Sequence, residues 1–331
     1  MASLKKRLGQ YTGWLRQLKA VYVLNNFLNR DRLQHNKKLY SKYGVKRNIL
    51  WPIGSHLFDF NQQGIPWLDR PNALATLEQH PDFKSFPQDT QNELRRFVKD
   101  GYMVLKGFFS PQQVARHNEE IEKGLQNQSL FFNYTGRKIM EAYKASAFID
   151  KEFFRNAELL RLLNFTMGKK VIPFHTINFK EGSEQAPHSD FIHMTTAPQG
   201  YLVAAWTALE DVSTANGTLV FYPGSHRLPY IMANDYSSGN TKWLIGNESN
   251  KQYEQKMASI IEEKGLKPHY FEGQAGDVFV WHANLIHGGS PILEEGRTRK
   301  SMVAHYFTEE VICFHEMSQR PALISKRSIE T

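Results

Sequence analysis

The sequence predicts a mainly β protein with flanking helices, whose strands form a double-stranded β-helix, a jelly-roll barrel. Seven short segments rich in β-branched and aromatic residues follow one another between residues 171 and 307, and turn residues separate them. Aromatic residues make up 13% of the chain, which suits a β-rich core. The wide mouth of such a barrel can hold a ligand or a metal ion.

The elements can be assigned in chain order. Residues 91–99 are expected to be helical and to end at Gly101, a residue type suited to a helix C-terminus. A second helix is expected from Pro111 to about Leu125, because Ser110 supplies an N-cap and Gln113 completes a capping box. Strands are expected at 171–179, 185–193, 202–209, 218–222, 270–272, 277–281 and 302–307.

These elements suggest one catalytic domain with additions at both ends. We expect the barrel domain at 91–315, after a basic helical extension at 1–50 and an irregular connection at 51–90. Residues 228–268 contain no strand pattern, so we expect a long insertion there that lies over the barrel mouth as a substrate lid. Residues 316–331 are expected to form a C-terminal tail.

The extension at 1–50 contains almost all of the excess positive charge. It holds 12 Lys and Arg residues against Asp31 alone, which gives +11, whereas the rest of the chain carries −3. Its apolar residues recur at steps of four and three, as on one face of an amphipathic helix. These residues are Leu4, Leu8, Tyr11, Leu15, Leu18 and Tyr22.

Three interpretations of this helix stay open. It can pack on the barrel or on a second subunit, lie on an anionic membrane surface, or serve as a cleaved organellar presequence. Nucleic-acid binding is disfavoured, because the basic residues accompany no recognisable recognition module. The extension therefore predicts a location or a partner more than it predicts a reaction.

The rest of the composition points to a soluble, cytoplasmic protein. The single cysteine, Cys313, excludes an intramolecular disulfide and a thiolate cluster, and its apolar neighbours suggest a buried, inert thiol. No apolar run approaches the roughly 20 residues that span a bilayer. Neither a secretory signal nor a peroxisomal S-K-L ending is found, so membrane-peripheral attachment and a presequence remain the alternatives to a simple cytoplasmic location.

The most informative motif combines His188, Asp190 and His287. Residues two apart on a strand project from the same face, so His188 and Asp190 can point at one ion. The apolar segment at 277–286 then delivers His287 at its far end. Two imidazoles and one carboxylate are the ligands of the facial triad that holds Fe(II) and leaves the other positions open. A structural His-Asp pair is the competing interpretation.

Two arginines follow the distal histidine. Arg297 and Arg299 precede the predicted strand at 302–307, and a guanidinium there offers a planar fork for a carboxylate. Other histidines near the expected barrel mouth are interpreted as structural, because a lone histidine is more often hydrogen-bonded than functional. They are His193, His226, His282 and His305.

In residues and in order, these motifs resemble the phytanoyl-CoA dioxygenase family of Fe(II)/2-oxoglutarate-dependent oxygenases, whose barrel is cupin-like. The resemblance runs from about Phe97 to Phe307. Residues 101–111 resemble the family's first strand and helix start, and residues 182–190 its metal-binding strand. The Asn-Gly and Pro-Gly-Ser-His pieces within 216–227 are the most diagnostic match.

The resemblance implies specific roles. His188, Asp190 and His287 would ligate Fe(II), and Arg299, with Arg297 as the alternative, would pair with the C5 carboxylate of 2-oxoglutarate. The reaction implied is O₂-dependent hydroxylation of an unactivated C–H bond with release of succinate and CO₂. The carboxylate at Asp190 favours hydroxylation over halogenation. Weaker candidates for contacts to 2-oxoglutarate or substrate are Trp206, which can equally be a core residue, Thr176, Asn178 and Gln185.

The substrate class is left broad. A small molecule or an acyl or lipid compound is expected, and the basic extension makes an acyl or lipid substrate more attractive. Two rival functions are a barrel that binds metal without catalysis and a membrane-surface interaction protein that acts through its basic helix.

Overall fold

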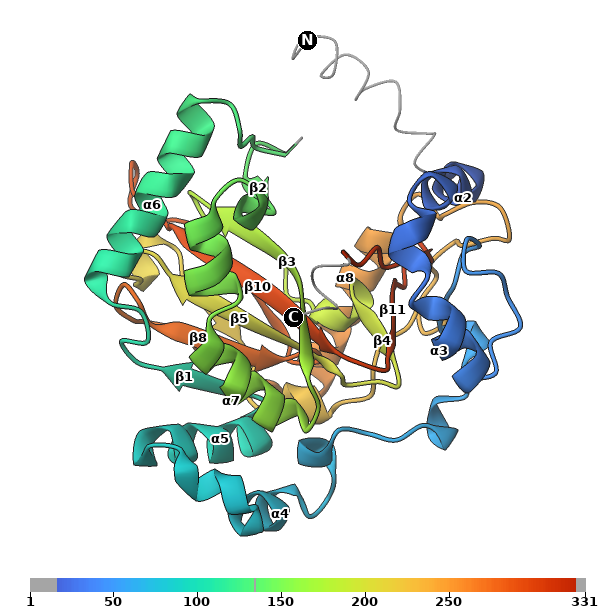
Figure 1. The fold of residues 1–331 in the computed structure, drawn as a ribbon, viewed down its shortest axis with the longest axis horizontal. Helices are drawn as coiled ribbons and strands as arrows, with labels where there is room; N and C mark the ends of the chain where they lie inside the picture. The colour runs from blue at the N-terminus through green and yellow to red at the C-terminus, as the bar shows by residue number, and fades with distance from the viewer. Residues whose placement is uncertain (1–16, 134, 326–331) are drawn as a thin grey trace.

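A six-stranded antiparallel sheet forms the centre of the molecule, which is described here by a computed structural model for residues 17–133 and 135–325 (Figure 1). Its order is β1-β8-β5-β10-β3-β2. The strands are β1 (Tyr102–Leu105), β2 (Lys138–Met140), β3 (Val171–Phe179), β5 (Leu202–Ala208), β8 (Val278–His282) and β10 (Ser301–Thr308).

Two three-stranded sheets accompany the large one. They are β7 (His269–Tyr270), β6 (Leu219–Phe221) and β9 (His287–Gly289), and β12 (Arg320–Pro321), β11 (Ile312–His315) and β4 (Thr195–Ala197). Within the described residues, the strand pairing of the three sheets stays separate, so the jelly roll is not hydrogen-bonded into a closed barrel.

The helices are α2 (Lys19–Leu28), α3 (Asn36–Lys42), α4 (Ala73–Gln79), α5 (Gln88–Asp100), α6 (Pro111–Gln126), α7 (Ala157–Met167) and α8 (Ser249–Glu263). Helices α5, α6 and α7 pack against one face of the large sheet. Alternate residues of β10, such as Met302 and Ala304, share a core with apolar residues of α5, α6 and α7. Val303, between them, packs with Trp206 in a second core on the opposite face. That opposite face is the one turned toward the functional site.

Local sequence signals explain two of these boundaries. Helix α6 starts as predicted, because the Ser110 side chain accepts from the backbone N–H of Gln113 and the Gln113 side chain accepts from the N–H of Ser110. Helix α5 ends at Gly101, whose φ of +83° favours glycine. None of the described helices is long and apolar enough to cross a membrane.

The predicted strand at 185–193 is wrong. His188 forms a single antiparallel bridge with His287, and Asp190 opens a short 3₁₀ helix, Asp190–Ile192. Pro187 has no N–H to donate, which removes one ladder hydrogen bond beside His188 and weakens strand pairing in this segment. The metal-binding segment is a loop pinned to the end of β9.

Residues outside the predicted limits of 91–315 also pack into the core. The stretch at 51–90 contains α4 and places Leu77 and Phe83 in the main core. The segment at 316–325 is equally integrated, because Glu316 is buried and accepts from the backbone and side chain of Ser55. The irregular, proline-containing sequence of these segments did not indicate that the fold buries their apolar residues.

The basic extension is likewise part of the fold from residue 17 onward. Leu33 and Ile49 pack with Ile312 and Phe314 of β11. Most of the predicted amphipathic face, Leu4 to Leu15, lies outside the described residues, and the helix α2 begins at Lys19.

The insertion at 228–268 contains helix α8. Through Tyr253 and Met257, α8 packs against Ile192 and Ile286, beside the predicted metal ligands. Cys313 is buried as expected, and burial raises the pKa of its thiol to about 12.

Candidate metal centre and active site

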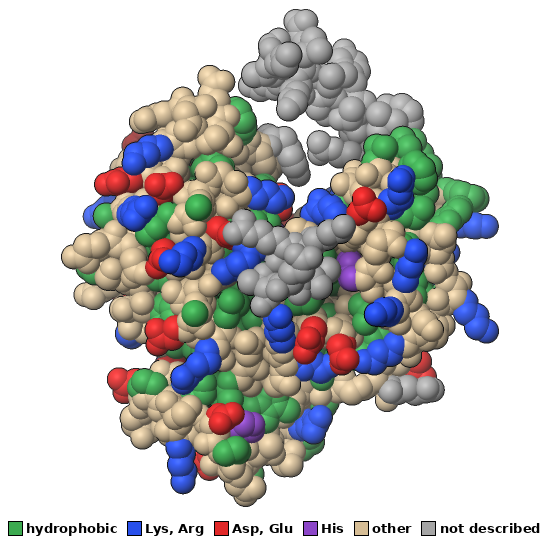
Figure 2. Space-filling view, in the orientation of Figure 1, with side chains coloured by type: hydrophobic (Ala, Val, Ile, Leu, Met, Phe, Trp, Pro, Cys, Tyr) green, Lys and Arg blue, Asp and Glu red, His purple; other side chains and the backbone are tan. Residues whose placement is uncertain are grey.

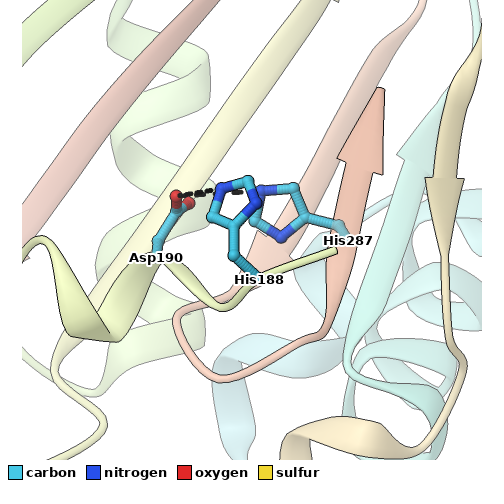
Figure 3. A group of neighbouring side chains, drawn as sticks. All are labelled: His188, Asp190 and His287. Atoms are coloured by element: carbon cyan, nitrogen blue, oxygen red, sulfur yellow. Dashed lines mark ion pairs between the residues drawn. The ribbon is translucent and has the colours of Figure 1, made fainter. Parts of the chain in front are cut away.

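Three side chains converge at the end of β9. The Nε2 atoms of His188 and His287 each lie 3.7 Å from Oδ1 of Asp190 (Figure 3). One ligand atom from each residue lies within 4.8 Å of the others, and all three residues are buried. Residues almost 100 positions apart therefore form one compact donor set.

The backbone fixes the directions of both imidazoles. His188 and His287 exchange two backbone hydrogen bonds of 2.9 Å. The Nδ1 atom of His188 lies 2.8 Å from the carbonyl oxygen of Ala186, and Nδ1 of His287 lies 3.0 Å from that of Leu285. Because a carbonyl oxygen can only accept, each Nδ1 carries the proton. The two Nε2 lone pairs are thus left to face Asp190, as metal ligation requires.

The carboxylate of Asp190 is held by two further side chains. Trp281 Nε1 donates to Oδ2 of Asp190 at 2.7 Å, and His305 Nε2 lies 3.2 Å from the same oxygen. Oδ2 is therefore engaged, and Oδ1 points toward the histidines. Trp281 was not predicted to touch the site, and His305 was interpreted as a structural histidine near the barrel mouth. Both occupy inward positions of β8 and β10, and strand alternation could have placed them there.

The protonation states also suit a cation. Burial lowers the pKa of His188 to about 3, so its imidazole is neutral near pH 7. Burial alone would raise the pKa of Asp190, but the neighbouring His287 and His305 bring it well below its usual value. A neutral imidazole, as at His188, and an ionised carboxylate, as at Asp190, are forms that bind a divalent metal. By donor identity, direction and charge, this site fits Fe(II).

Arg299 lies deep in the same inner region. Its side chain is buried, with Cζ 5.5 Å from the centre of the Trp206 ring and Nη1 3.5 Å from Ser301 Oγ. Burial lowers the pKa of Arg299 to about 10, which leaves the group charged at neutral pH. Within the described residues it has no carboxylate partner, and its Nε has no hydrogen bond. A buried guanidinium in this state matches an anionic ligand.

Arg297 does not share this environment. It is exposed, and its Nε pairs with Glu294 at 2.6 Å. The sequence offered Arg299, with Arg297 as the alternative, as the partner of the cosubstrate carboxylate. In the structure Arg299 is buried, whereas Arg297 is exposed and already paired.

A cavity of about 1230 Å³ opens at the triad. His175 and Ile177 of β3, His305 of β10, and the polar residue Gln185 line it together with the metal ligands His188 and Asp190. Gln185 Nε2 lies 3.2 Å from His188 Nε2, so this candidate residue does reach the site.

The comparison with protein families decides the identity. The model of the phytanoyl-CoA dioxygenase family matches residues 97–301, which is more than half of the chain. This chain belongs to the phytanoyl-CoA dioxygenase family. It is therefore an enzyme of the Fe(II)/2-oxoglutarate-dependent oxygenase type, as the motifs predicted.

Two relatives show the breadth of this family. Peroxisomal phytanoyl-CoA dioxygenase of Homo sapiens is 24% identical over 264 residues, which cover 71% of this chain and 74% of the relative. Ectoine dioxygenase of Nocardia farcinica is 26% identical over 219 residues, covering 60% and 71%.

Solved structures confirm the jelly-roll fold. EctD from S. alaskensis, with 2-oxoglutarate and 5-hydroxyectoine, matches with a TM-score of 0.55 at 20% identity and covers 72% of this chain and 83% of its own. The non-heme alpha ketoglutarate dependent epimerase SnoN matches with a TM-score of 0.54 at 20% identity, covering 69% and 85%. The cupin-like fold expected from the sequence is thus shared with these proteins.

Two predicted contacts fall on the wrong face of β3. Thr176 and Asn178 are paired with Ala304 and Met302, whose side chains belong to the helix-covered core. Asn178 Nδ2 lies 3.4 Å from Nε2 of His117 on α6. Because side chains alternate along a strand, these two positions point away from the metal ligands, and the adjacent His175 and Ile177 line the cavity instead.

Trp206 satisfies both interpretations that the sequence left open. It is buried in the inner core against Phe271, and its ring also lies beneath the guanidinium of Arg299. The core role and the proximity to the candidate cosubstrate site are therefore compatible.

Proposed function

We propose that this member of the phytanoyl-CoA dioxygenase family hydroxylates an unactivated C–H bond of a small-molecule or acyl substrate, using Fe(II), 2-oxoglutarate and O₂ and releasing succinate and CO₂. The main support is the triad, in which the two Nε2 atoms lie 3.7 Å from one oxygen of Asp190. The cosubstrates of the structurally similar EctD and SnoN point the same way.

Each residue of the site has a proposed role in this reaction. His188, Asp190 and His287 would hold the iron, which with its cosubstrate supplies the oxidising power that no side chain has. Arg299 would receive the far carboxylate of 2-oxoglutarate, and the Trp206 ring would keep the guanidinium plane in place. Trp281 and His305 position the carboxylate of Asp190.

The cavity supports an extended substrate. Its volume of about 1230 Å³ exceeds the roughly 300–1,000 Å³ of most small-molecule sites, so a cosubstrate and an acyl chain can fit together. Apolar side chains line it beside the polar ones, including Phe174, Ile177, Met194 and Leu323. Such walls would bind hydrocarbon and exclude water from the reacting carbon.

Succinate formation tests the proposal. Purified protein would be incubated with Fe(II), ascorbate, 2-oxoglutarate and a panel of acyl and small-molecule compounds, with Asp190→Ala as the matched blank. We expect substrate-stimulated succinate from the wild type and none from the variant. Iron binding without succinate above the Asp190→Ala level for any compound would instead support a non-catalytic barrel.

A further inference from the structure

Helix α2 is amphipathic in the reverse sense to a normal surface helix. The residues it buries are polar, Lys19 and Asn26, and each makes hydrogen bonds to the body of the protein. Its large apolar side chains face outward instead: Leu24 is 61% exposed, Phe27 50% and Leu28 73%. A helix normally turns its apolar stripe toward the core, so this face is built to meet an apolar partner.

Exposed tryptophans extend this face. Trp243 is 60% exposed, and its carbonyl oxygen accepts from the N–H of Lys19 at the start of α2. Trp51 follows Leu50, whose carbonyl oxygen accepts from Asn26 on the same helix. We call these apolar side chains the α2 patch, and hydrophobic side chains gather over α2 at the upper right of Figure 2. The patch consists of Val21, Leu24, Phe27, Leu28, Trp51, Trp243 and Leu244.

Cations border the α2 patch and are not neutralised. The guanidinium of Arg30 lies 5.4 Å from the Phe27 ring, and the Lys242 ammonium lies 5.1 Å from the Trp243 ring. In the described part of the chain, Arg30, Lys242 and Arg47 form no ion pair with a carboxylate. Asp31 is the sole acidic residue among the first 50. The border is thus positive and ready for an anion.

A separate cavity lies within this border. It has a volume of about 490 Å³ and is formed between α2 and residues 233–243. Lys19, Arg47, Lys242 and both exposed tryptophans line it, and no Asp or Glu does. Cations together with aromatic rings, without acidic groups, suit an anionic headgroup whose apolar part continues onto the patch.

We propose that the α2 patch docks this protein onto an anionic lipid bilayer, with α2 lying in the membrane interface and the bordering cations on lipid headgroups. Tryptophan and outward-facing leucine and phenylalanine are the side chains that enter this interface, and Lys and Arg add attraction to anionic lipid. The charge of +11 in residues 1–50 complements an anionic lipid surface.

The placement of α2 links this surface to the triad. Asn25 and the buried Asn26 of α2 line the large cavity that also contains His188 and Asp190. The docked helix would therefore lie between the bilayer and the active site, so an acyl substrate could pass from the membrane into the cavity. This link rests on the proposed function, whereas the docking itself does not.

Vesicle cosedimentation of the full chain tests the docking without iron or substrate. Vesicles of phosphatidylcholine alone would be compared with an equimolar mixture of phosphatidylcholine and phosphatidylserine. We expect binding to the mixed vesicles that is at least tenfold tighter than to phosphatidylcholine and that weakens in high salt. Replacing Arg47 and Lys242 by Gln should reduce it by about fivefold for each cation removed.

The decisive variant is Leu24→Gln/Phe27→Gln/Leu28→Gln, matched by Phe131→Gln/Leu293→Gln, which alters exposed apolar residues elsewhere. We expect the first to lose at least a hundredfold in binding and the second to bind like the wild type. Unchanged binding of the first variant overturns the proposal. Two other outcomes would also overturn it, because each would mean that protein already covers the patch. One is a wild-type dimer that becomes monomeric in this variant, and the other is a larger fall in Tm for this variant than for the control variant.

Discussion

At the scale of single residues, the triad depends on side chains that do not touch the metal. Trp281 and His305 hold Oδ2 of Asp190 and leave Oδ1 for the ion. Removing such an outer contact typically lowers metal affinity 10- to 100-fold. We therefore expect Trp281→Phe to weaken Co(II) binding, measured by spectroscopic titration, by about 10- to 100-fold. Trp67→Phe, at a tryptophan that bonds the carbonyl oxygens of Phe165 and Thr166, should leave metal binding unchanged.

Arg299 and Arg297 make a matched pair for the cosubstrate site. Truncating one member of a buried charge pair costs roughly 2–5 kcal/mol, which is about 30-fold or more in affinity. We expect Arg299→Gln to raise the KM for 2-oxoglutarate by at least about 30-fold. Arg297→Gln, at an exposed residue that pairs with Glu294, should leave this KM unchanged. The reverse pattern in steady-state kinetics would transfer the role to Arg297.

At the scale of elements, local signals predicted regular structure well. The strand at 171–179 and the start of the helix at Pro111 agree with β3 and α6, because apolar alternation and a capping box depend on neighbouring residues alone. The segment around His188 was predicted as a strand, yet a single bridge to His287 holds it in place. That long-range contact leaves no periodic trace in the sequence.

Side-chain direction was the second limit at this scale. The sequence placed Thr176 and Asn178 on the correct strand but could not say which face meets the triad. Both faces of β3 carry apolar as well as polar side chains, so its composition does not distinguish them. His175 lies on the other face of β3. The pairing register of β3 with β10 identifies that face as the one toward the triad.

Two turn glycines, Gly101 and Gly107, predict how alanine substitutions change the stability of the protein. Gly101 has φ +83°, and a Cβ there would come within 2.5 Å of the His226 ring, whereas Gly107 has φ +56° and open space around that position. We expect Gly107→Ala to lower the free energy of unfolding by about 1 kcal/mol through backbone strain alone. Gly101→Ala should cost more than that, because the His226 ring must also move. Equal urea midpoints for the two variants would contradict the steric argument.

At the scale of the whole molecule, part of the N-terminal region packs into the body of the protein. Leu33 is fully buried against the β11 residues Ile312 and Phe314, whereas Leu24 is 61% exposed. Leu33→Ala should therefore lower the free energy of unfolding by about 2–5 kcal/mol, and Leu24→Ala by less than about 0.5 kcal/mol. Deleting residues 1–50 should leave the protein insoluble or unfolded. A truncated protein that keeps the wild-type Tm would show that this region is separable after all.

Burial of histidine side chains makes the metal-free protein sensitive to acid. Burial lowers the pKa of His117 to about 3 and that of His188 to about 3, although an unfolded histidine titrates near 6.5. Between pH 6.5 and about 3 the unfolded chain thus binds more protons than the folded one, so stability is present at higher pH and is lost as the pH falls through this window. Urea unfolding in EDTA should show a slope of up to about 1.4 kcal/mol per pH unit for each such histidine. His117→Gln, which is remote from the triad, should flatten this slope by about one such contribution, and an unchanged slope would mean that His117 is protonated in the folded protein.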